Sequence, residues 1–219
     1  MLKRAIVRLL GRERANRVSA PYHDWQARRR TQERLAALPA KGLCINLGCG
    51  PAPLDGWVNV DIARSAHVDL VWDLRRGLPF ADESCALIFS EHVIEHLSRE
   101  EAERLVGECR RVLEPGGVLR LSTPDAERFL RSYAGDHEFL RHPEFPEPIE
   151  TPLDRINMMM REGGQHLWVY DSASLISLLR RAGFSAASRQ EFGVSGHARM
   201  QHIDTPGRAF ESLYVEAVK

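Results

Sequence analysis

The chain reads Leu43-Cys44-Ile45-Asn46-Leu47-Gly48-Cys49-Gly50-Pro51 at the point where an apolar, β-prone run meets two glycines. A second apolar run, Trp57-Val58-Asn59-Val60, follows and ends on Asp61. This order predicts a buried parallel strand, a tight turn and a carboxylate at the tip of the next strand. Glycine has no Cβ, so the turn can approach a ligand closely. Because the Asp61 carboxylate could accept hydrogen bonds from two ribose hydroxyls, we expect a nucleoside site here.

The glycine pattern argues against a nicotinamide dinucleotide. The dinucleotide fingerprint needs three glycines, the third allowing close packing of helix against strand. Gly48 and Gly50 fit the first two positions, but Pro53 stands at the third. Prolines at 51 and 53 also disfavour a helix whose N-terminus would cradle a pyrophosphate.

Beyond this stretch, strand-like and helix-like segments alternate, which is typical of a parallel sheet covered by helices on both faces. The pattern predicts helices from Ser98 to about Leu113, from Pro124-Asp125 onwards, and from Asp171 to Ala182-Gly183. Pro115-Gly116-Gly117 is expected to end the first of them. The predicted strands cover residues 43–47, 57–61, 69–72, 86–90, 117–122 and 212–218.

Length and composition indicate one domain with an attached segment. The chain has 219 residues and a formal net charge of zero, and nothing in its composition calls for a nucleic-acid partner. Residues 1–40 hold ten basic against three acidic side chains, and we expect them to form a basic, helical N-terminal segment, with one helix running from near Asp24 to Leu38. Residues 41–219 would form the main domain. The proline-rich and aromatic residues 132–165 would be an irregular inserted lid.

The first ten residues suggest a peripheral membrane contact. Leu2, Ile6 and Leu9 share one helical face, with basic residues opposite. Residues 1–19 could therefore lie on an anionic membrane surface, or pack as an ordinary terminal helix. The sequence shows no signal peptide, no membrane span and no cysteine spacing typical of paired cysteines, so we expect a cytoplasmic protein. Any membrane contact through residues 1–19 would then be at the inner membrane face.

Six segments, taken in order, resemble the motifs of the class I S-adenosylmethionine-dependent methyltransferases. The likeness is close over residues 40–125 and looser to residue 219. It implies a Rossmann-like, seven-stranded, mostly parallel sheet and S-adenosylmethionine as the cofactor. The segments are Leu43–Pro51, Val58–Asp61, Val71–Leu74, Leu78–Ser84, Ser90–Leu97 and Arg111–Gly117.

The resemblance also implies which residues meet the cofactor. The glycine turn would face the methionine part, the second strand the ribose, and the third strand the adenine. The end of the fourth strand would lie between cofactor and methyl acceptor. The predicted cofactor-binding residues are Asn46, Gly48, Cys49, Gly50, Asp61, Ile62, Asp73, Leu74, Ser90 and Glu91.

Two histidines are candidates for a general base. Methyl transfer to a hydroxyl benefits from a base that removes its proton, and imidazole titrates near neutral pH. His92 leaves the fourth strand beside the expected acceptor, and His166 precedes Tyr170-Asp171 in a segment resembling one that closes over the acceptor in related bacterial enzymes of glycan and secondary-metabolite assembly. The expected reaction is therefore O-methylation of a sugar, a lipid-linked glycan or another small molecule. A cofactor-binding regulatory protein is the alternative.

A third interpretation comes from His92-Val93-Ile94-Glu95-His96, which matches the H-x-x-E-H motif of zinc peptidases. On a helix, that spacing places two imidazoles one turn apart, where they could share a metal. The methyltransferase resemblance already accounts for the segment, and no third ligand motif follows it. We therefore expect no metal site.

Overall fold

The computed structural model of the chain describes residues 29, 31–145 and 148–219. Residues 29 and 31–37 are helical and belong to the helix predicted from Asp24 to Leu38. The predicted membrane-surface helix within residues 1–19 lies outside the described residues.

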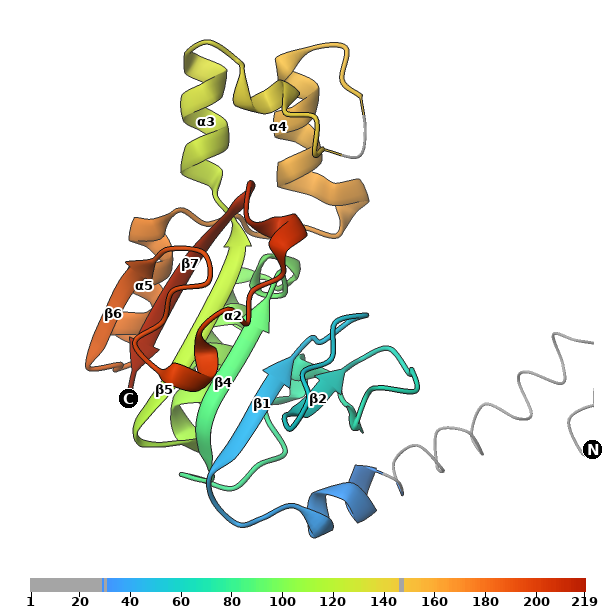
Figure 1. Cartoon of the computed structure of the whole chain (residues 1–219), viewed down its shortest axis with the longest axis vertical. Coiled ribbons are helices and arrows are strands. Elements are labelled where there is room, and N and C mark those ends of the chain that lie inside the picture. Colours follow the sequence, from blue (N-terminus) through green and yellow to red (C-terminus); the bar gives the residue numbers. More distant parts are fainter. Residues whose placement is uncertain (1–28, 30, 146–147) are drawn as a thin grey trace, which may run out of the picture.

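Seven strands form one mixed sheet in the order β3-β2-β1-β4-β5-β7-β6. Strands β1 to β5 run parallel to one another, whereas β7 runs antiparallel to both β5 and β6. The predicted seven-stranded, mostly parallel α/β architecture is therefore confirmed (Figure 1). The strands are β1 (Leu43–Leu47), β2 (Val58–Asp61), β3 (Leu70–Val71), β4 (Cys85–Glu91), β5 (Leu113–Pro124), β6 (Ala186–Gln190) and β7 (Ser212–Val218).

The helices begin at polar caps, as the sequence predicts. Helix α2 (Arg99–Val112) starts with a capping box between Ser98 and Glu101, which satisfies backbone donors of its first turn. The caps of α3 (Ala126–Ala134) and α5 (Ser172–Arg181) are Asp125 and Asp171. Helix α2 ends at Val112, within one residue of the predicted limit, but Pro115-Gly116-Gly117 does not end it: β5 begins at once with Leu113, and these residues lie inside the strand.

The two faces of the sheet are covered differently. Helices α2 and α5 pack on one face, over alternate strand residues such as Ile45, Ile88 and Val215. On the other face, Met200 of the segment 191–211 packs on Cys44 and Leu87. That segment contains only the short turns η5 (Ala198–Met200) and η6 (Pro206–Arg208), so the cover on this face is a loop and not the expected helix (Figure 1).

Residues 132–165 are more regular than the sequence indicates. They include η3 (Phe139–Arg141), α4 (Pro152–Arg161) and η4 (Glu162–Gly164). Together with α3 they form a small helical unit with its own apolar core, which includes Phe129, Leu140 and Ile156. The prolines misled the sequence interpretation, because Pro152 occupies the first turn of α4, where proline is tolerated. The unit projects from the carboxyl end of β5 (Figure 1).

Strand β6 has no counterpart among the predicted strands. Its residues, Ala-Ala-Ser-Arg-Gln, are largely exposed and pair only with β7 at the edge of the sheet. An edge strand of small and polar residues lacks the apolar alternation by which strands are recognised. Within the described ranges, no helix is long and apolar enough to cross a membrane.

Candidate functional site

The glycine turn after β1 is held against β2 and the segment after β4. The backbone N–H groups of Gly48 and Cys49 both donate to the carbonyl oxygen of Val60, at 2.8 and 3.1 Å. Gly48 has a φ of +67°, and a Cβ placed on it would lie 2.2 Å from Cγ2 of Val93. Only glycine fits this position, for conformational and for steric reasons.

Asp61 at the end of β2 fastens the same turn. One carboxylate oxygen accepts from the N–H of Gly50 at 2.8 Å, and the other accepts from the N–H of Ala63 at 2.6 Å. A carboxylate offers about four lone pairs. Asp61 can therefore hold the turn and still accept hydrogen bonds from a ligand.

A cleft of about 570 Å³, here called the strand-end cleft, opens at the ends of β1, β2 and β3. Five of the predicted cofactor-binding residues line it: Gly48, Asp61, Ile62, Asp73 and Leu74. The Ile62 side chain is 62% exposed, so it offers an apolar surface to a flat ring. The full lining is Gly48, Asp61, Ile62, Trp72, Asp73, Leu74, Arg75, His92, Val93, His96, Leu97 and Gln165.

The carboxylate of Asp73 is committed to a neighbour. It accepts from Nε and Nη2 of Arg75 at 2.8 and 2.9 Å, and this guanidinium lowers the pKa of Asp73 below its usual range. The fixed charge leaves Asp73 as an anion at the rim of the strand-end cleft.

Three other predicted residues line a separate pocket of about 80 Å³ beside the segment 191–211. The Nδ2 of Asn46 donates to the carbonyl oxygen of Ala52, so Asn46 supports the loop after the glycine turn. Glu91 accepts from the backbone and the hydroxyl of Thr205. The thiol of Cys49 is buried, which raises its pKa to about 11.

Ser90 and Gly50 line neither this pocket nor the strand-end cleft. The Ser90 hydroxyl is buried and donates to the carbonyl oxygen of Leu47 at 3.2 Å, which ties β4 to β1. Gly50 contributes its N–H to Asp61. The direct cofactor contacts of all ten residues stay predictions.

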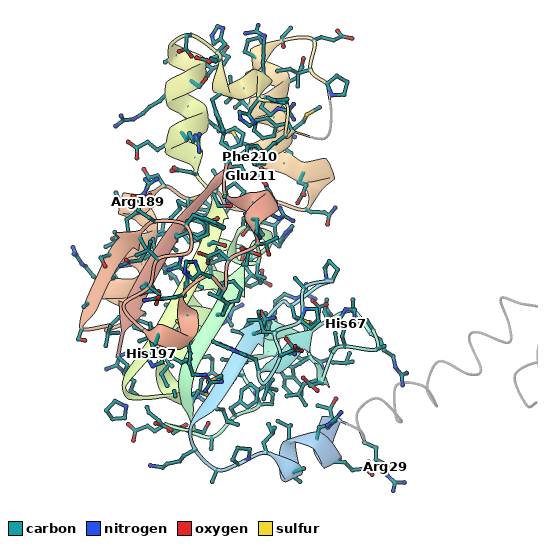
Figure 2. The ribbon with its side chains drawn as sticks, in the orientation of Figure 1. Arg29, His67, Arg189, His197, Phe210 and Glu211 are labelled. Atoms are coloured by element: carbon teal, nitrogen blue, oxygen red, sulfur yellow. The ribbon has the colours of Figure 1, made fainter. Side chains whose placement is uncertain are left out.

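A second cleft of about 590 Å³, here called the helical cleft, lies between the α3–α4 unit and the turn η6. His92 lines both clefts, so they adjoin at this residue. Figure 2 shows Phe210 and Glu211 of its wall at the base of the helical unit. The full lining is His92, Pro124, Phe129, Glu144, Phe145, Arg155, Met158, Met159, Glu162, Gly163, Gln165, His166, Gly207, Arg208, Phe210 and Glu211.

Both ring nitrogens of His92 are engaged by the protein. Arg208 can only donate, and its Nη1 lies 3.0 Å from Nδ1 of His92, so Nδ1 is the acceptor. The Nε2–H group then donates to the hydroxyl of Ser212, at 2.6 Å. Burial, with the positive charge of Arg208, lowers the pKa of His92 to about 2. At neutral pH the His92 imidazole is therefore uncharged and is a weak base. Its ring lies between the two clefts.

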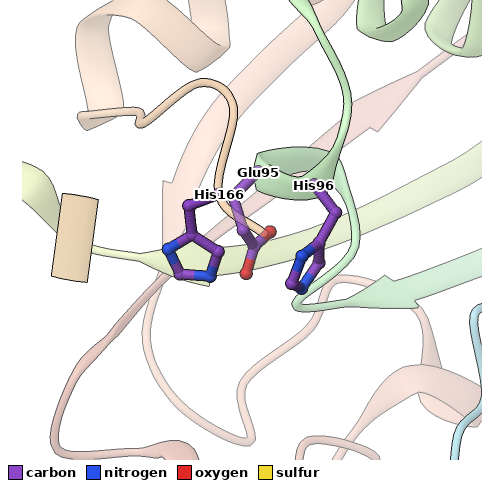
Figure 3. A group of neighbouring side chains, drawn as sticks. All are labelled: Glu95, His96 and His166. Atoms are coloured by element: carbon purple, nitrogen blue, oxygen red, sulfur yellow. The ribbon is translucent and has the colours of Figure 1, made fainter. Parts of the chain in front are cut away.

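His166 lies in a cluster with Glu95, His96 and Glu162. Its Nδ1 donates to the carbonyl oxygen of Met159 at 2.5 Å, and its Nε2 lies 2.8 Å from a carboxylate oxygen of Glu162. The rings of His166 and His96 meet edge to face at 4.9 Å. Figure 3 shows the Glu95 carboxylate between the two imidazoles.

The H-x-x-E-H segment does not form the arrangement that zinc peptidases require. His92 has a φ of 52°, and only Ile94–His96 are helical, as the 3-10 turn η2. The imidazoles of His92 and His96 are therefore not stacked on successive turns of an α-helix. The sequence interpretation also missed His166 as a neighbour of Glu95 and His96.

Several cleft residues carry no sequence signal that would have singled them out. Arg208, Phe210 and Glu211 reach the helical cleft because the segment 191–211 crosses the sheet and returns to the end of β4. Trp72 and Val93 lie within the motif segments Val71–Leu74 and Ser90–Leu97 but are not among the predicted cofactor contacts. They line the strand-end cleft, where Trp72 donates through Nε1 to the carbonyl oxygen of Gly77.

Residues 46–121 match a family model described as a methyltransferase domain. A probable S-adenosylmethionine-dependent methyltransferase of Mycolicibacterium smegmatis is 39% identical over 154 residues, which are 67% of this chain and 49% of that protein. A malonyl-[acyl-carrier protein] O-methyltransferase of Coxiella burnetii is 37% identical over 87 residues, covering 39% of this chain and 30% of that one. The chain thus spans about half, or less, of the length of these curated relatives.

Solved structures confirm the fold. A protein of Thermotoga maritima, described as a possible histamine N-methyltransferase, superposes with a TM-score of 0.52 at 19% identity, covering 98% of both chains. An S-adenosylmethionine-dependent methyltransferase of Archaeoglobus fulgidus gives a TM-score of 0.51 at 14% identity, over 90% of this chain and 94% of that one.

Proposed function

Because this chain belongs to the class I S-adenosylmethionine-dependent methyltransferase family, we propose that it transfers the cofactor's methyl group to a hydroxyl of a sugar, a lipid-linked glycan or another small molecule. The observation that carries the proposal is the pair of clefts that adjoin at His92. With the cofactor in the strand-end cleft and the acceptor in the helical cleft, the methyl group would pass from one to the other beside His92.

The strand-end cleft suits the nucleoside end of the cofactor. It combines one carboxylate for ribose hydroxyls, Asp61, with apolar surface from Ile62 and Leu74 for a purine ring. In methyl transfer the sulfonium supplies the leaving group, so the protein mainly has to align methyl and nucleophile.

The helical cleft suits an acceptor with both apolar and polar surfaces. Its wall has aromatic rings at Phe129, Phe145 and Phe210, next to charged groups at Arg155 and Glu211. The Arg155 guanidinium lies 4.0 Å from the centre of the Phe145 ring, which places charge and aromatic surface at one point. Such a wall can bind a polyhydroxylated molecule in two ways: the aromatic rings contact its apolar faces, and the charged groups form hydrogen bonds with its hydroxyls.

For removal of the acceptor proton, the geometry favours His166 over His92. Both ring nitrogens of His92 already have partners, and the pKa of this imidazole, about 2, makes it a weak base. His166 lines the helical cleft, and its Nε2 contacts the Glu162 carboxylate, onto which a proton can pass. Deprotonation is therefore assigned to the cluster that contains His166.

A lipid-linked acceptor would agree with the proposed surface contact of residues 1–19 at the inner membrane face. That contact concerns residues outside the described ranges and rests on the sequence pattern alone.

The first experiment is calorimetric titration with S-adenosylhomocysteine, the demethylated cofactor. We expect micromolar binding by the full chain and a loss of about 100-fold or more in Asp61→Ala, because desolvated ribose hydroxyls lose a charged acceptor. Asp61 also holds the glycine turn, so Ile62→Ala serves as a second variant: its exposed side chain can be shortened without a cost to folding.

Asp55→Ala is the matched control, since it removes an exposed carboxylate from the same loop without touching either cleft. Unchanged affinity in both Asp61→Ala and Ile62→Ala would refute the placement of the cofactor. No binding by the intact chain would refute the proposed activity.

A further inference from the structure

We propose that Glu95, His96 and His166 bind a divalent transition-metal ion of the zinc class, with Glu162 at the rim of the site. One ligand atom from each of the first three residues lies within 4.8 Å of the others. Glu162 adds a carboxylate oxygen 2.8 Å from Nε2 of His166 and 3.8 Å from Nε2 of His96.

These separations need only small side-chain movements to close around an ion. With bonds of about 2.1 Å to zinc, tetrahedral ligand atoms stand roughly 3.4 Å apart. His96 is partly exposed and Glu162 is half exposed, so both side chains have room to rotate. Glu95 and His166 are buried and would supply the fixed side of the site.

The two histidines are oriented as metal ligands usually are. Nδ1 of His166 contacts the carbonyl oxygen of Met159, and Nδ1 of His96 lies 3.3 Å from the carbonyl oxygen of Gln165. A carbonyl can only accept, so each Nδ1 must carry a hydrogen, and Nε2 is the nitrogen of each ring through which it could bind an ion. Backbone carbonyls typically accept a hydrogen bond from the ring nitrogen of an imidazole that does not bind the metal, and they fix its tautomer in this way.

The buried carboxylate of Glu95 supplies a second, independent observation. Its side chain is 0% exposed, one oxygen accepts from the Thr123 hydroxyl, and the other, Oε1, has no hydrogen-bond donor. Nδ1 of His92 lies 3.3 Å from Oε1 but already accepts from Arg208, so it has no hydrogen to donate. An unpaired buried oxygen is costly, and a cation would satisfy it.

The ligand set selects the metal class. Two imidazoles and a carboxylate suit zinc and related borderline ions, whereas magnesium and calcium prefer oxygen ligands alone. With Glu95, His96 and His166 as its three protein ligands, a tetrahedral ion would retain one open position, at the rim where Glu162 lies.

The site would also lie between the two clefts. His96 lines the strand-end cleft, and Glu162 and His166 line the helical cleft. A consequence for catalysis rests on the proposed function: with Nε2 of His166 bound to the ion, this imidazole would no longer be the base, and an acceptor hydroxyl at the open position would lose its proton more readily, as metal-bound water does. The binding of the ion itself does not depend on that function.

Zinc titration of metal-stripped full-length protein, followed by calorimetry, tests the site directly. We expect one tight zinc per chain, and at least about 100-fold weaker binding in His166→Gln and in His96→Gln. Cobalt in place of zinc should give visible absorption bands that both variants lose. His197→Gln removes a histidine that lines neither cleft and should bind as the unchanged protein does.

S-adenosylhomocysteine binding, measured on the same samples, separates the two proposals. Intact cofactor binding without tight zinc, or tight zinc retained by both histidine variants, would overturn the metal site and leave the proposed function standing. Zinc lost in both variants, with no cofactor binding by any form, would support the metal site and refute the proposed function.

Discussion

At the scale of single residues, Gly48 controls how closely a ligand can approach the end of β1. Its positive φ and its contact with Val93 leave no room for a side chain. The same residue lines the strand-end cleft, so any shift of the turn would change the shape of that cleft. The conformation of the glycine turn and the distance to which a ligand can approach it therefore both depend on Gly48.

Gly48→Ala should weaken S-adenosylhomocysteine binding by more than tenfold, because its Cβ would push the turn or Val93 away. The left-handed conformation adds about 1–2 kcal/mol of strain for a residue other than glycine. Gly116→Ala is the matched control: Gly116 has a φ of +79° but open space around it, so strain arises without a clash. Calorimetry measures the affinity of both variants for S-adenosylhomocysteine. Equal affinities of the two variants would contradict the steric argument.

At the scale of elements, helix α2 positions the chain that leads into β4. Glu108 of this helix accepts from the N–H of Leu78 at 2.9 Å and from the guanidinium of Arg111. Arg111 in turn donates to the carbonyl oxygens of Leu78 and Phe80. These contacts fix residues 77–82 ahead of strand β4, which ends at Glu91.

Glu108→Gln should lower the free energy of unfolding by about 1 kcal/mol at pH 7, since the amide cannot replace a charged acceptor. Arg111 lowers the folded-state pKa of Glu108 below the ordinary 4.5. The unfolded chain therefore binds the proton more readily, so the stabilisation is present above pH 4.5 and is lost as pH falls through the folded pKa.

Urea denaturation of both proteins across that range measures the effect, and the difference should shrink towards acid pH. Glu100→Gln, in the exposed first turn of the same helix, is the control and should show a smaller effect. A pH-independent difference for Glu108→Gln would mean that the loss comes from packing and not from charge.

At the scale of the whole molecule, the segment 191–211 joins the second face of the sheet to the two clefts. Arg120 of β5 is 0% exposed and donates to the carboxylates of Asp204 and Glu216. It also donates to the backbone of the segment, at the carbonyl oxygen of Val194. From this anchor the chain continues to Arg208, which contacts His92.

Asp204→Ala should lower the free energy of unfolding by about 3–5 kcal/mol, because it leaves a buried guanidinium without its main partner. Folded Asp204→Ala protein should also bind an acceptor more weakly, since the segment that carries Arg208 loses its contact with Arg120. Arg131→Ala, which breaks an exposed pair with Glu127, should cost less than about 1 kcal/mol. Thermal melting measures the stability of both variants. Similar losses of stability in Asp204→Ala and Arg131→Ala would contradict the proposal that Asp204 anchors the segment 191–211 to Arg120.

The sequence alone determined the order of strands around the glycine turn, the carboxylate at the end of β2, and the polar caps of α2, α3 and α5. These features depend on residues close in the chain, where periodicity, glycine conformation and capping act locally. Ten cofactor contacts were predicted from motif order, and five of those residues line the strand-end cleft.

Only the tertiary structure decided which way the other strand-end residues face and which distant residues join them. Asn46 and Glu91 alternate with core residues of β1 and β4, so they point to the face under the segment 191–211. His92 meets Arg208 across 116 positions, and His96 meets Gln165 across 69. Such contacts arise where long connections close over the sheet, and no local pattern in the chain encodes where such a connection will end.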